Sequence, residues 1–304
     1  MDYTGEKIMK KIYYSEKLID NVVKLSTELA NSTVESSVNN KIRWYLSPQA
    51  HMARIKREVL AIEQVRRCTT KDSSILEIGS GIGTCCIIMK ALTDAEIVGA
   101  EPAPESYSYL HECIQNFREC NPQYPYIAIN AGGENIPYAN ETFDFIYSFE
   151  VLEHVQDPCT VLKEIYRLLK PNGCAYIATC NYDSFYEGHY ERFWNPFIGV
   201  GGNRKRYIKK GLSPKFLSEL NFITKKKIKL WTEDIGFSNL IFNPEVIKIK
   251  DKREFELCYP DGFIMPSIEK EKTNRLNRLV QSPFVTKILK RFDREYKLYF
   301  LLIK

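Results

Sequence analysis

The pattern of apolar positions divides the chain into two parts. Through residues 1–70 the apolar side chains recur at helical spacing, as at Met52, Ile55 and Val59. We therefore expect an N-terminal helical cap over this part. From Ser74 onward, short apolar runs alternate with helical stretches, which is the pattern of a mostly parallel α/β sheet.

Seven strands are expected in the second part, which we treat as one domain over residues 71–304. Five of them are predicted before residue 181, at Ile75–Ile78, Glu96–Ala100, Tyr126–Asn130, Phe143–Ser148 and Cys174–Thr179. A sixth is predicted at Ser238–Phe242. The seventh is "EYKLYFLLIK", whose almost continuous apolar run is typical of a strand inside a sheet.

Two helices of this domain can be delimited from the sequence. The first is predicted at Asp157–Leu169, because Asp157 suits an N-cap, Pro158 suits a first turn and "KPNG" follows as a stop signal. The second is predicted at Ile223–Gly236. Residues 181–222 and 244–290 interrupt the alternation, and we expect them to be insertions after the fifth and sixth strands that cover the acceptor side of the sheet.

The stretch "ILEIGSGIG" places three glycines, Gly79, Gly81 and Gly83, directly after the first strand. A strand that leads into glycines and then a helix brings backbone close to a ligand beyond the carboxyl end of the sheet. Glycine permits that approach because it has no Cβ and reaches positive φ freely. A dinucleotide fold would have its third glycine at Thr84, and Glu77 in the strand would repel a pyrophosphate.

Glu101, at the end of the second strand, completes the pattern. Its carboxylate is placed to accept hydrogen bonds from both hydroxyl groups of a ribose. The ligand implied carries a ribose and positive charge but no phosphate. S-adenosylmethionine fits this description, and NAD fits it poorly.

Composition excludes some classes of protein but does not indicate a function. The chain has 304 residues, 44% of them hydrophobic, with a net charge of +5 and no apolar run long enough for a membrane span. No secretory signal is recognisable, and the nine cysteines form no CxxC motif, so we expect reduced thiols in a cytoplasmic protein. The late lysine-rich runs are either solvated faces or attract a phosphorylated substrate or nucleic acid.

Five motifs in a fixed order resemble the class I S-adenosylmethionine-dependent methyltransferases: "ILEIGSGIG", "VGAEP", "GGENIPY", "FDFIYSFEVLEHV" and "LLKPNGCAYIAT". The resemblance covers roughly Ser74–Cys180 and implies a Rossmann-like fold with S-adenosylmethionine as cofactor. By position it also implies a cofactor site made of Glu77, Gly79, Ser80, Gly81, Gly83, Glu101, Pro102, Gly133, Glu134, Phe149 and Glu150. Gly132 stands where many relatives carry the acid that reads the adenine amino group; Glu134, water or backbone would substitute.

The acceptor site is expected after the fifth strand, in "YEGHYERFWNP". Methyl transfer to a hydroxyl group requires a base, and His189 is our first candidate among the four histidines. His154 is the second candidate; the alternative is that it orients its loop. Tyr182, Tyr186, Tyr190 and Trp194 are expected to line an acceptor pocket, or else to form an aromatic core patch, and Arg204 would bind phosphate.

The "EGHY" stretch is also similar to bacterial methyltransferases of surface-polysaccharide and small-molecule biosynthesis. The leading hypothesis is therefore O-methylation of a small-molecule acceptor, a nucleotide-linked or glycan-bound sugar. Methylation of a quinone-like ring, RNA methylation or binding, and a catalytically silent scaffold are the alternatives, and "SFEV" in place of an NPPY-type motif disfavours nucleic acid. We expect no metal, because no second histidine lies near His189 in the sequence, and homodimerisation stays open.

Overall fold

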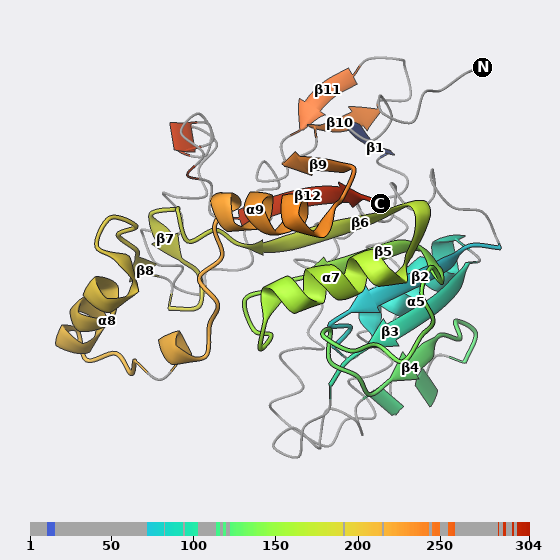
Figure 1. Cartoon of the computed structure of the whole chain (residues 1–304), viewed down its shortest axis with the longest axis horizontal. Coiled ribbons are helices and arrows are strands. Elements are labelled where there is room, and N and C mark those ends of the chain that lie inside the picture. The colour runs from blue at the N-terminus through green and yellow to red at the C-terminus, as the bar shows by residue number, and fades with distance from the viewer. Residues whose placement is uncertain are drawn as a thin grey trace.

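A seven-stranded sheet forms the centre of the molecule (Figure 1). The computed structural model describes residues 11–15, 72–81, 83–93, 95–102, 114–115, 118–119, 122–190, 192–214, 216–242, 245–249, 255–258, 285, 288–289, 294 and 297–304. In spatial order the strands are β4 (Ile127–Ile129), β3 (Glu96–Ala100), β2 (Ser74–Ile78), β5 (Phe143–Phe149), β6 (Leu169–Cys180), β12 (Lys297–Ile303) and β9 (Asn239–Phe242). The predicted Rossmann-like, mostly parallel sheet is confirmed.

One strand runs against the others. β12 pairs antiparallel with β6 on one side and with β9 on the other, while β4, β3, β2, β5 and β6 are mutually parallel. All seven residues of β12 are buried, as its continuous apolar run predicts. β12 therefore lies inside the sheet.

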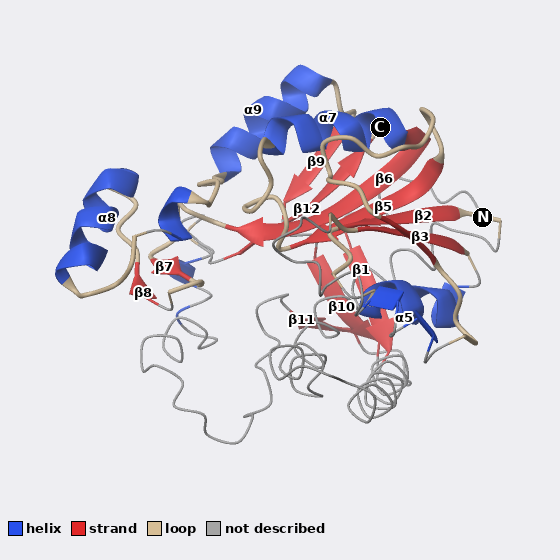
Figure 2. Ribbon diagram, turned by 90° about the horizontal axis from the view of Figure 1, so that it is seen from below, coloured by secondary structure: helices blue, strands red, loops and turns tan. Residues whose placement is uncertain are grey.

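Helices cover both faces of the sheet, as expected. Figure 2 shows α7 (Pro158–Leu168) and α9 (Lys225–Ile235) on one face and α5 (Thr84–Thr93) on the other. Each face has its own apolar cluster, with Cys86, Ile87 and Met89 packing on the α5 side. None of the described helices has the length and apolar character that crossing a bilayer requires.

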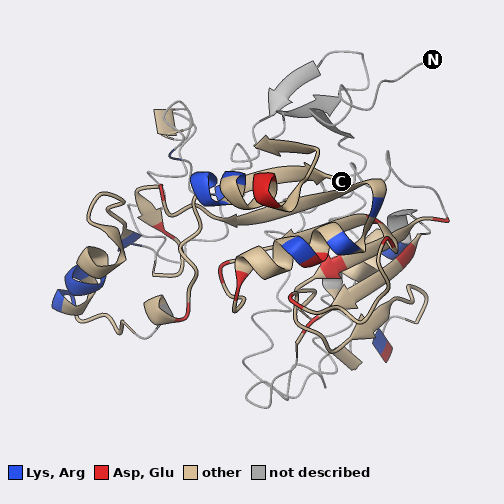
Figure 3. Cartoon of the chain, in the orientation of Figure 1, with Lys and Arg blue, Asp and Glu red and all other residues tan. Residues whose placement is uncertain are grey.

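The insertion after β6 is a small module beyond the end of that strand (Figure 1). It contains β7 (Tyr186–Glu187), β8 (Arg192–Phe193), α8 (Gly199–Lys209) and the short 3-10 helix η2 (Phe216–Ser218). Most of the Lys and Arg residues of the module lie on α8 (Figure 3). A separate apolar cluster holds the module together; its buried members are Cys180, Tyr182, Trp194, Tyr207 and Leu217.

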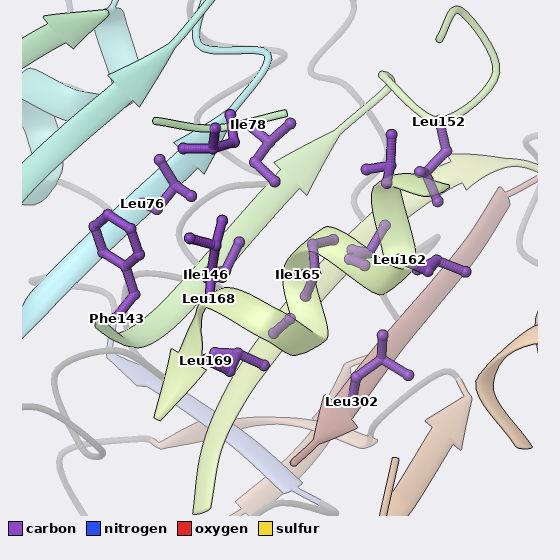
Figure 4. Packing of buried hydrophobic residues seen from close by; sticks show 14 of the residues in the cluster. Leu76, Ile78, Phe143, Ile146, Leu152, Leu162, Ile165, Leu168, Leu169 and Leu302 are labelled. Carbon is purple, nitrogen blue, oxygen red and sulfur yellow. The ribbon is translucent and has the colours of Figure 1, made fainter. Parts of the chain in front are cut away.

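The helix α7 shows how local sequence sets an element. Asp157 has extended backbone and its side chain accepts a hydrogen bond from the amide of Cys159, which is an N-cap, and Pro158 occupies the first turn. The apolar face of the helix packs onto the sheet through Val161, Leu162, Ile165 and Leu168, all fully buried, of which Figure 4 labels the last three. Leu169, expected to end the helix, is its C-cap and also begins β6.

The N-terminal expectation needs a correction. Residues Lys11–Ser15, expected within a helical cap, form strand β1, which pairs in parallel with β10 (Glu245–Ile249). β11 (Phe255–Cys258) then pairs antiparallel with β10. The segment "KIYYS" is rich in residues that favour strands, so this local preference outweighs the helical spacing nearby. The rest of residues 1–70 and most of 259–290 lie outside the described residues.

Candidate active site

The three glycines that follow β2 have a backbone conformation that favours glycine. Gly79, Gly81 and Gly83 have φ values of 75°, 53° and 88°. A Cβ at Gly79 would overlap the side chain of Val151, and one at Gly83 would overlap the hydroxyl of Tyr126. The predicted positive φ is therefore present at all three glycines. The close contacts at Gly79 and Gly83 are with side chains of the chain itself, and the expected approach to a ligand stays a prediction.

The acidic residues at the ends of β2 and β3 are held in place around this loop. Glu77 is buried, and one of its oxygens accepts hydrogen bonds of 3.0 Å from the thiol of Cys86 and from the hydroxyl of Tyr147. The carboxylate of Glu101 accepts a 2.8 Å hydrogen bond from the amide of Gly81. The structure thus brings Glu101 and the glycine loop into direct contact.

The loop expected beside the adenine is tied to the start of α7. Gly133 packs closely, since an added Cβ would lie 2.9 Å from the side chain of Ile78. An oxygen of Glu134 accepts hydrogen bonds from the amides of Gln156 and Asp157 at 2.8 and 3.4 Å. That oxygen orders the loop, and the expected role of Glu134 at the adenine stays a prediction. Pro102 is exposed.

Glu150 follows β5 in a strained conformation. Its φ of 58° lies in the left-handed region, which residues other than glycine seldom adopt. Its amide donates to the carbonyl of Ala178 at 2.9 Å, and its carboxylate forms a 2.7 Å ion pair with Lys297 on β12. The preceding Phe149 packs edge-on against Tyr176. Neighbouring strands therefore maintain a conformation that Glu150 would not keep alone.

The structure brings together His154 and His189, the two candidate catalytic residues. Their Nε2 atoms lie 3.3 Å apart, with the two rings nearly perpendicular. The Nδ1 atom of His189 lies 2.6 Å from the carboxylate of Glu187, whose side chain is completely buried. The same carboxylate accepts hydrogen bonds from the amide of Tyr190 and the hydroxyl of Tyr182, at 2.7 and 3.2 Å.

Glu153 adds a carboxyl group that the sequence-based expectations missed. It is fully buried, and one oxygen accepts a 2.7 Å hydrogen bond from the hydroxyl of Thr179. The other oxygen has no hydrogen-bond partner among the described residues. Burial, together with the nearby charge of Glu150, raises the pKa of Glu153 to about 7. A signal for both Glu153 and Glu187 was their position one and two residues before a candidate histidine.

The two histidines have different electrostatic surroundings. His154 is exposed on one side; desolvation of the rest of its ring and the charge of His189 lower its pKa. Burial alone would lower the pKa of His189, but the hydrogen bond to Glu187 and the charge of that carboxylate outweigh burial and raise it. At neutral pH the pair therefore combines a more basic imidazole with a less basic one.

The aromatic residues of the module mostly face inward. Tyr182, Tyr186 and Trp194 are buried, and the indole of Trp194 donates to the carbonyl of Tyr182 at 3.0 Å. Tyr190 is half-buried, with its hydroxyl bonded to the carbonyl of Ser213 at 2.6 Å. These contacts match the aromatic core patch that the sequence left open as an alternative. Arg204 is exposed on α8, a helix that carries several Lys and Arg residues (Figure 3).

Comparison with known proteins decides the family. Residues 45–240 match the family model described as "Methyltransferase domain". The chain belongs to this methyltransferase family. With its central sheet and glycine loop it is a class I enzyme of the S-adenosylmethionine-dependent type, and S-adenosylmethionine is its cofactor, as the five motifs predict.

Relatives of this methyltransferase are moderately similar. It is 27% identical over 200 residues to a ubiquinone biosynthesis O-methyltransferase of Pseudomonas putida (strain GB-1), covering 64% of this chain and 78% of that one. An uncharacterised protein of Methanocaldococcus jannaschii is 32% identical over 148 residues, covering 47% and 63%. The solved structure of a geranyl diphosphate methyltransferase in complex with S-adenosylmethionine has the same fold, with a TM-score of 0.51 at 12% identity and coverage of 84% and 88%.

Proposed function

We propose that this methyltransferase transfers the methyl group of S-adenosylmethionine to the oxygen of a hydroxyl group on a small acceptor. The observation that carries the proposal is the facing pair His154 and His189, backed by Glu187, beyond the carboxyl ends of β5 and β6. A hydroxyl oxygen becomes a sufficient nucleophile when its proton is removed, and imidazoles are suited to promote this near neutral pH.

The transfer itself needs alignment more than covalent help from the protein. The bond from the methyl carbon to sulfur breaks, its electron pair stays on sulfur, and the acceptor oxygen forms the new bond to carbon. The products are the methyl ether, S-adenosylhomocysteine and the hydroxyl proton. Holding oxygen, carbon and sulfur in line, sheltered from water, supplies much of the rate.

In this proposal the cofactor lies along the ends of β2, β3 and β5. Glu101 would exchange its hydrogen bond with Gly81 for the ribose hydroxyls, and Glu150 would lie near the sulfonium. The remaining proposed contacts are Glu77, Gly79, Ser80, Gly83, Pro102, Gly133, Glu134 and Phe149. Support comes from the contact of Glu101 with the glycine loop and from the positive φ values of that loop.

For the acceptor we propose a hydroxylated ring of the quinone-precursor kind. A phenolic hydroxyl has a pKa of about 10, far below that of a sugar hydroxyl, so its proton is lost more easily near neutral pH. The printed name of the Pseudomonas relative, a ubiquinone biosynthesis O-methyltransferase, supports this choice. Tyr182 and Trp194, two of the residues expected to stack on a sugar, are buried.

A nucleotide-linked sugar is the second candidate. It is supported by the exposed cations on α8 and just after its end, which suit phosphate groups. They are Arg204, Lys205, Lys209 and Lys210.

The test is transfer of a labelled methyl group to a matched panel. The panel contains prenylated aromatic rings with two hydroxyl groups, the same rings with both hydroxyl groups already methylated, and nucleotide sugars. Labelling of the free ring alone supports the first candidate, and labelling of the sugars supports the second. His189→Ala should lower kcat by about 100-fold or more while the affinity for S-adenosylhomocysteine stays unchanged. Normal turnover in this variant would contradict the role of the histidine pair.

A further inference from the structure

We propose that Glu153, His154 and His189 hold a divalent transition-metal ion of the zinc class, with open coordination positions that face the acceptor. The ligating atoms of these three residues all lie within 4.8 Å of one another. Only the role of the ion in methyl transfer rests on the proposed function; its binding does not.

The donor set is that of a catalytic metal site. Two imidazoles and one carboxylate leave positions open for water or substrate, as in zinc hydrolases. Imidazole nitrogen favours zinc and its neighbours over Mg²⁺ and Ca²⁺, which select oxygen ligands. The sequence did not indicate this site because His154 precedes His189 by 35 residues; the fold supplies the second histidine.

The spacing of the two imidazoles fits a shared ion. Nitrogen atoms that each lie ~2.0–2.1 Å from a tetrahedral ion are about 3.3–3.4 Å apart. The Nε2 atoms of His154 and His189 are separated by 3.3 Å. The side chains already stand at the distance that coordination would impose.

Glu187 supplies the support that a metal-binding histidine needs. Because its carboxylate accepts the proton on Nδ1 of His189, the lone pair of Nε2 is directed toward His154. Glu187 is itself fixed by the amide of Tyr190 and the hydroxyl of Tyr182. A carboxylate behind a ligating imidazole orients the ring and raises its basicity.

An independent observation also points to a cation. The Oε1 atom of Glu153 is buried without a hydrogen-bond partner among the described residues, while Thr179 holds Oε2. A buried carboxylate oxygen in this state is costly, and a bound cation would relieve the cost. His154 is exposed and offers a route of entry from solvent.

A second group of donors, Glu150, Glu153 and Cys180, lies beside the first. It suits a cation less well because Lys297 already forms an ion pair with Glu150 at 2.7 Å. Its positive charge would repel a metal ion there. Glu153 therefore serves the histidine pair.

The ion would act on the acceptor hydroxyl. Coordination of the oxygen in an open position lowers the pKa of the hydroxyl, so that its proton leaves to solvent water before the oxygen attacks the methyl carbon. The histidine pair thus promotes loss of the proton as metal ligands rather than as a free base. No oxidant or further reactant is needed.

The experiment is titration of the chelator-treated full chain with Zn²⁺ alone, followed by calorimetry, and with Co²⁺, followed by absorption spectroscopy. We expect one equivalent of Zn²⁺ to bind. His154→Ala, His189→Ala and Glu153→Gln should each weaken binding at least tenfold, and Glu187→Gln about 10- to 100-fold through the orientation of His189. Glu96→Gln is the matched control and should bind Zn²⁺ normally. Glu96 is an exposed carboxylate at the first residue of β3, the end of the strand away from Glu101.

Several results would overturn the site. These are the absence of stoichiometric binding, binding unchanged in both histidine variants, or a thiolate–cobalt absorption band that disappears in Cys180→Ser. S-adenosylhomocysteine affinity, measured on the same metal-free chain, reports separately on the proposed function and on whether each variant is folded. Methyl transfer should fall on chelation and return with Zn²⁺. Activity that survives chelation would refute the role of the ion.

Discussion

At the scale of single residues, the cofactor side of the site depends on a few side chains that neighbouring backbone holds in place. Glu101 already makes a hydrogen bond to the amide of Gly81, so its carboxylate is positioned before any ligand arrives. Pre-positioning of this kind reduces the entropy lost on binding. A single substitution there should affect the ligand more than the fold.

We expect Glu101→Ala to weaken binding of S-adenosylhomocysteine at least tenfold. The variant removes charge-assisted hydrogen bonds to the ribose that contribute about 1.5–3 kcal/mol each, and tenfold corresponds to about 1.4 kcal/mol. Calorimetric titration measures the change, with Glu96→Ala as control. An unchanged affinity would contradict the ribose assignment.

Two glycines of the same loop should differ in their tolerance of a methyl group. Gly81→Ala adds a Cβ where nothing lies within 4 Å, so the cost is that of left-handed backbone, about 1–2 kcal/mol. Gly83→Ala adds an overlap with the hydroxyl of Tyr126, for a total of about 3 kcal/mol. Urea unfolding without ligand compares the two variants. Equal losses of unfolding free energy in the two variants would show that Tyr126 moves aside freely.

At the scale of elements, helix boundaries follow from capping chemistry. α9 begins after Thr224, whose side chain accepts from the amide of Lys227, and ends at Gly236 in left-handed conformation. The sequence predicted this helix and α7 to within about two residues, because each cap depends on side chains only a few positions away. β1 shows the opposite case, since its pairing with β10 joins distant segments.

We expect Asp157→Ala to lower the free energy of unfolding by about 1 kcal/mol through loss of the N-cap of α7. The hydrogen bond from Thr160 is the main reason that the pKa of Asp157 lies below its usual value. The charged cap therefore stabilises the fold above the ordinary carboxyl pKa, and this contribution is lost as the pH falls through the lowered value. Asp157→Ser keeps an acceptor without a charge and should remove the part of the pH dependence that Asp157 contributes. Urea unfolding across acidic pH measures both effects.

At the scale of the whole molecule, β12 contributes a side chain to the site that the middle of the chain forms. β12 inserts between β6 and β9 and carries Lys297 to the carboxylate of Glu150. The side chain of Lys297 is nearly buried, so the ion pair is shielded on one side from water. Stability and site geometry are therefore linked through one contact.

Lys297→Met should destabilise the protein by about 2 kcal/mol. Breaking a buried ion pair leaves an uncompensated charge. The expected loss of unfolding free energy is smaller than for a fully buried pair, because the side chain of Glu150 is about a third exposed. Adding Glu150→Gln to this variant should restore most of the lost free energy of unfolding, because the unpaired charge is removed. Thermal unfolding of the single and double variants tests this, and a double variant less stable than the single one would contradict it.

What the sequence determined by itself is the sheet, the helices α7 and α9, the glycine loop and the identity of the cofactor. These depend on apolar periodicity, caps, positive φ, the spacing from the glycine loop to Glu101 and the order of the five motifs. Tertiary structure alone decided that His154 meets His189 and that most of the module's aromatic residues face inward. Each of those outcomes depends on which segments the parallel sheet brings to its carboxyl edge, and contacts between distant segments leave no periodic trace in the sequence.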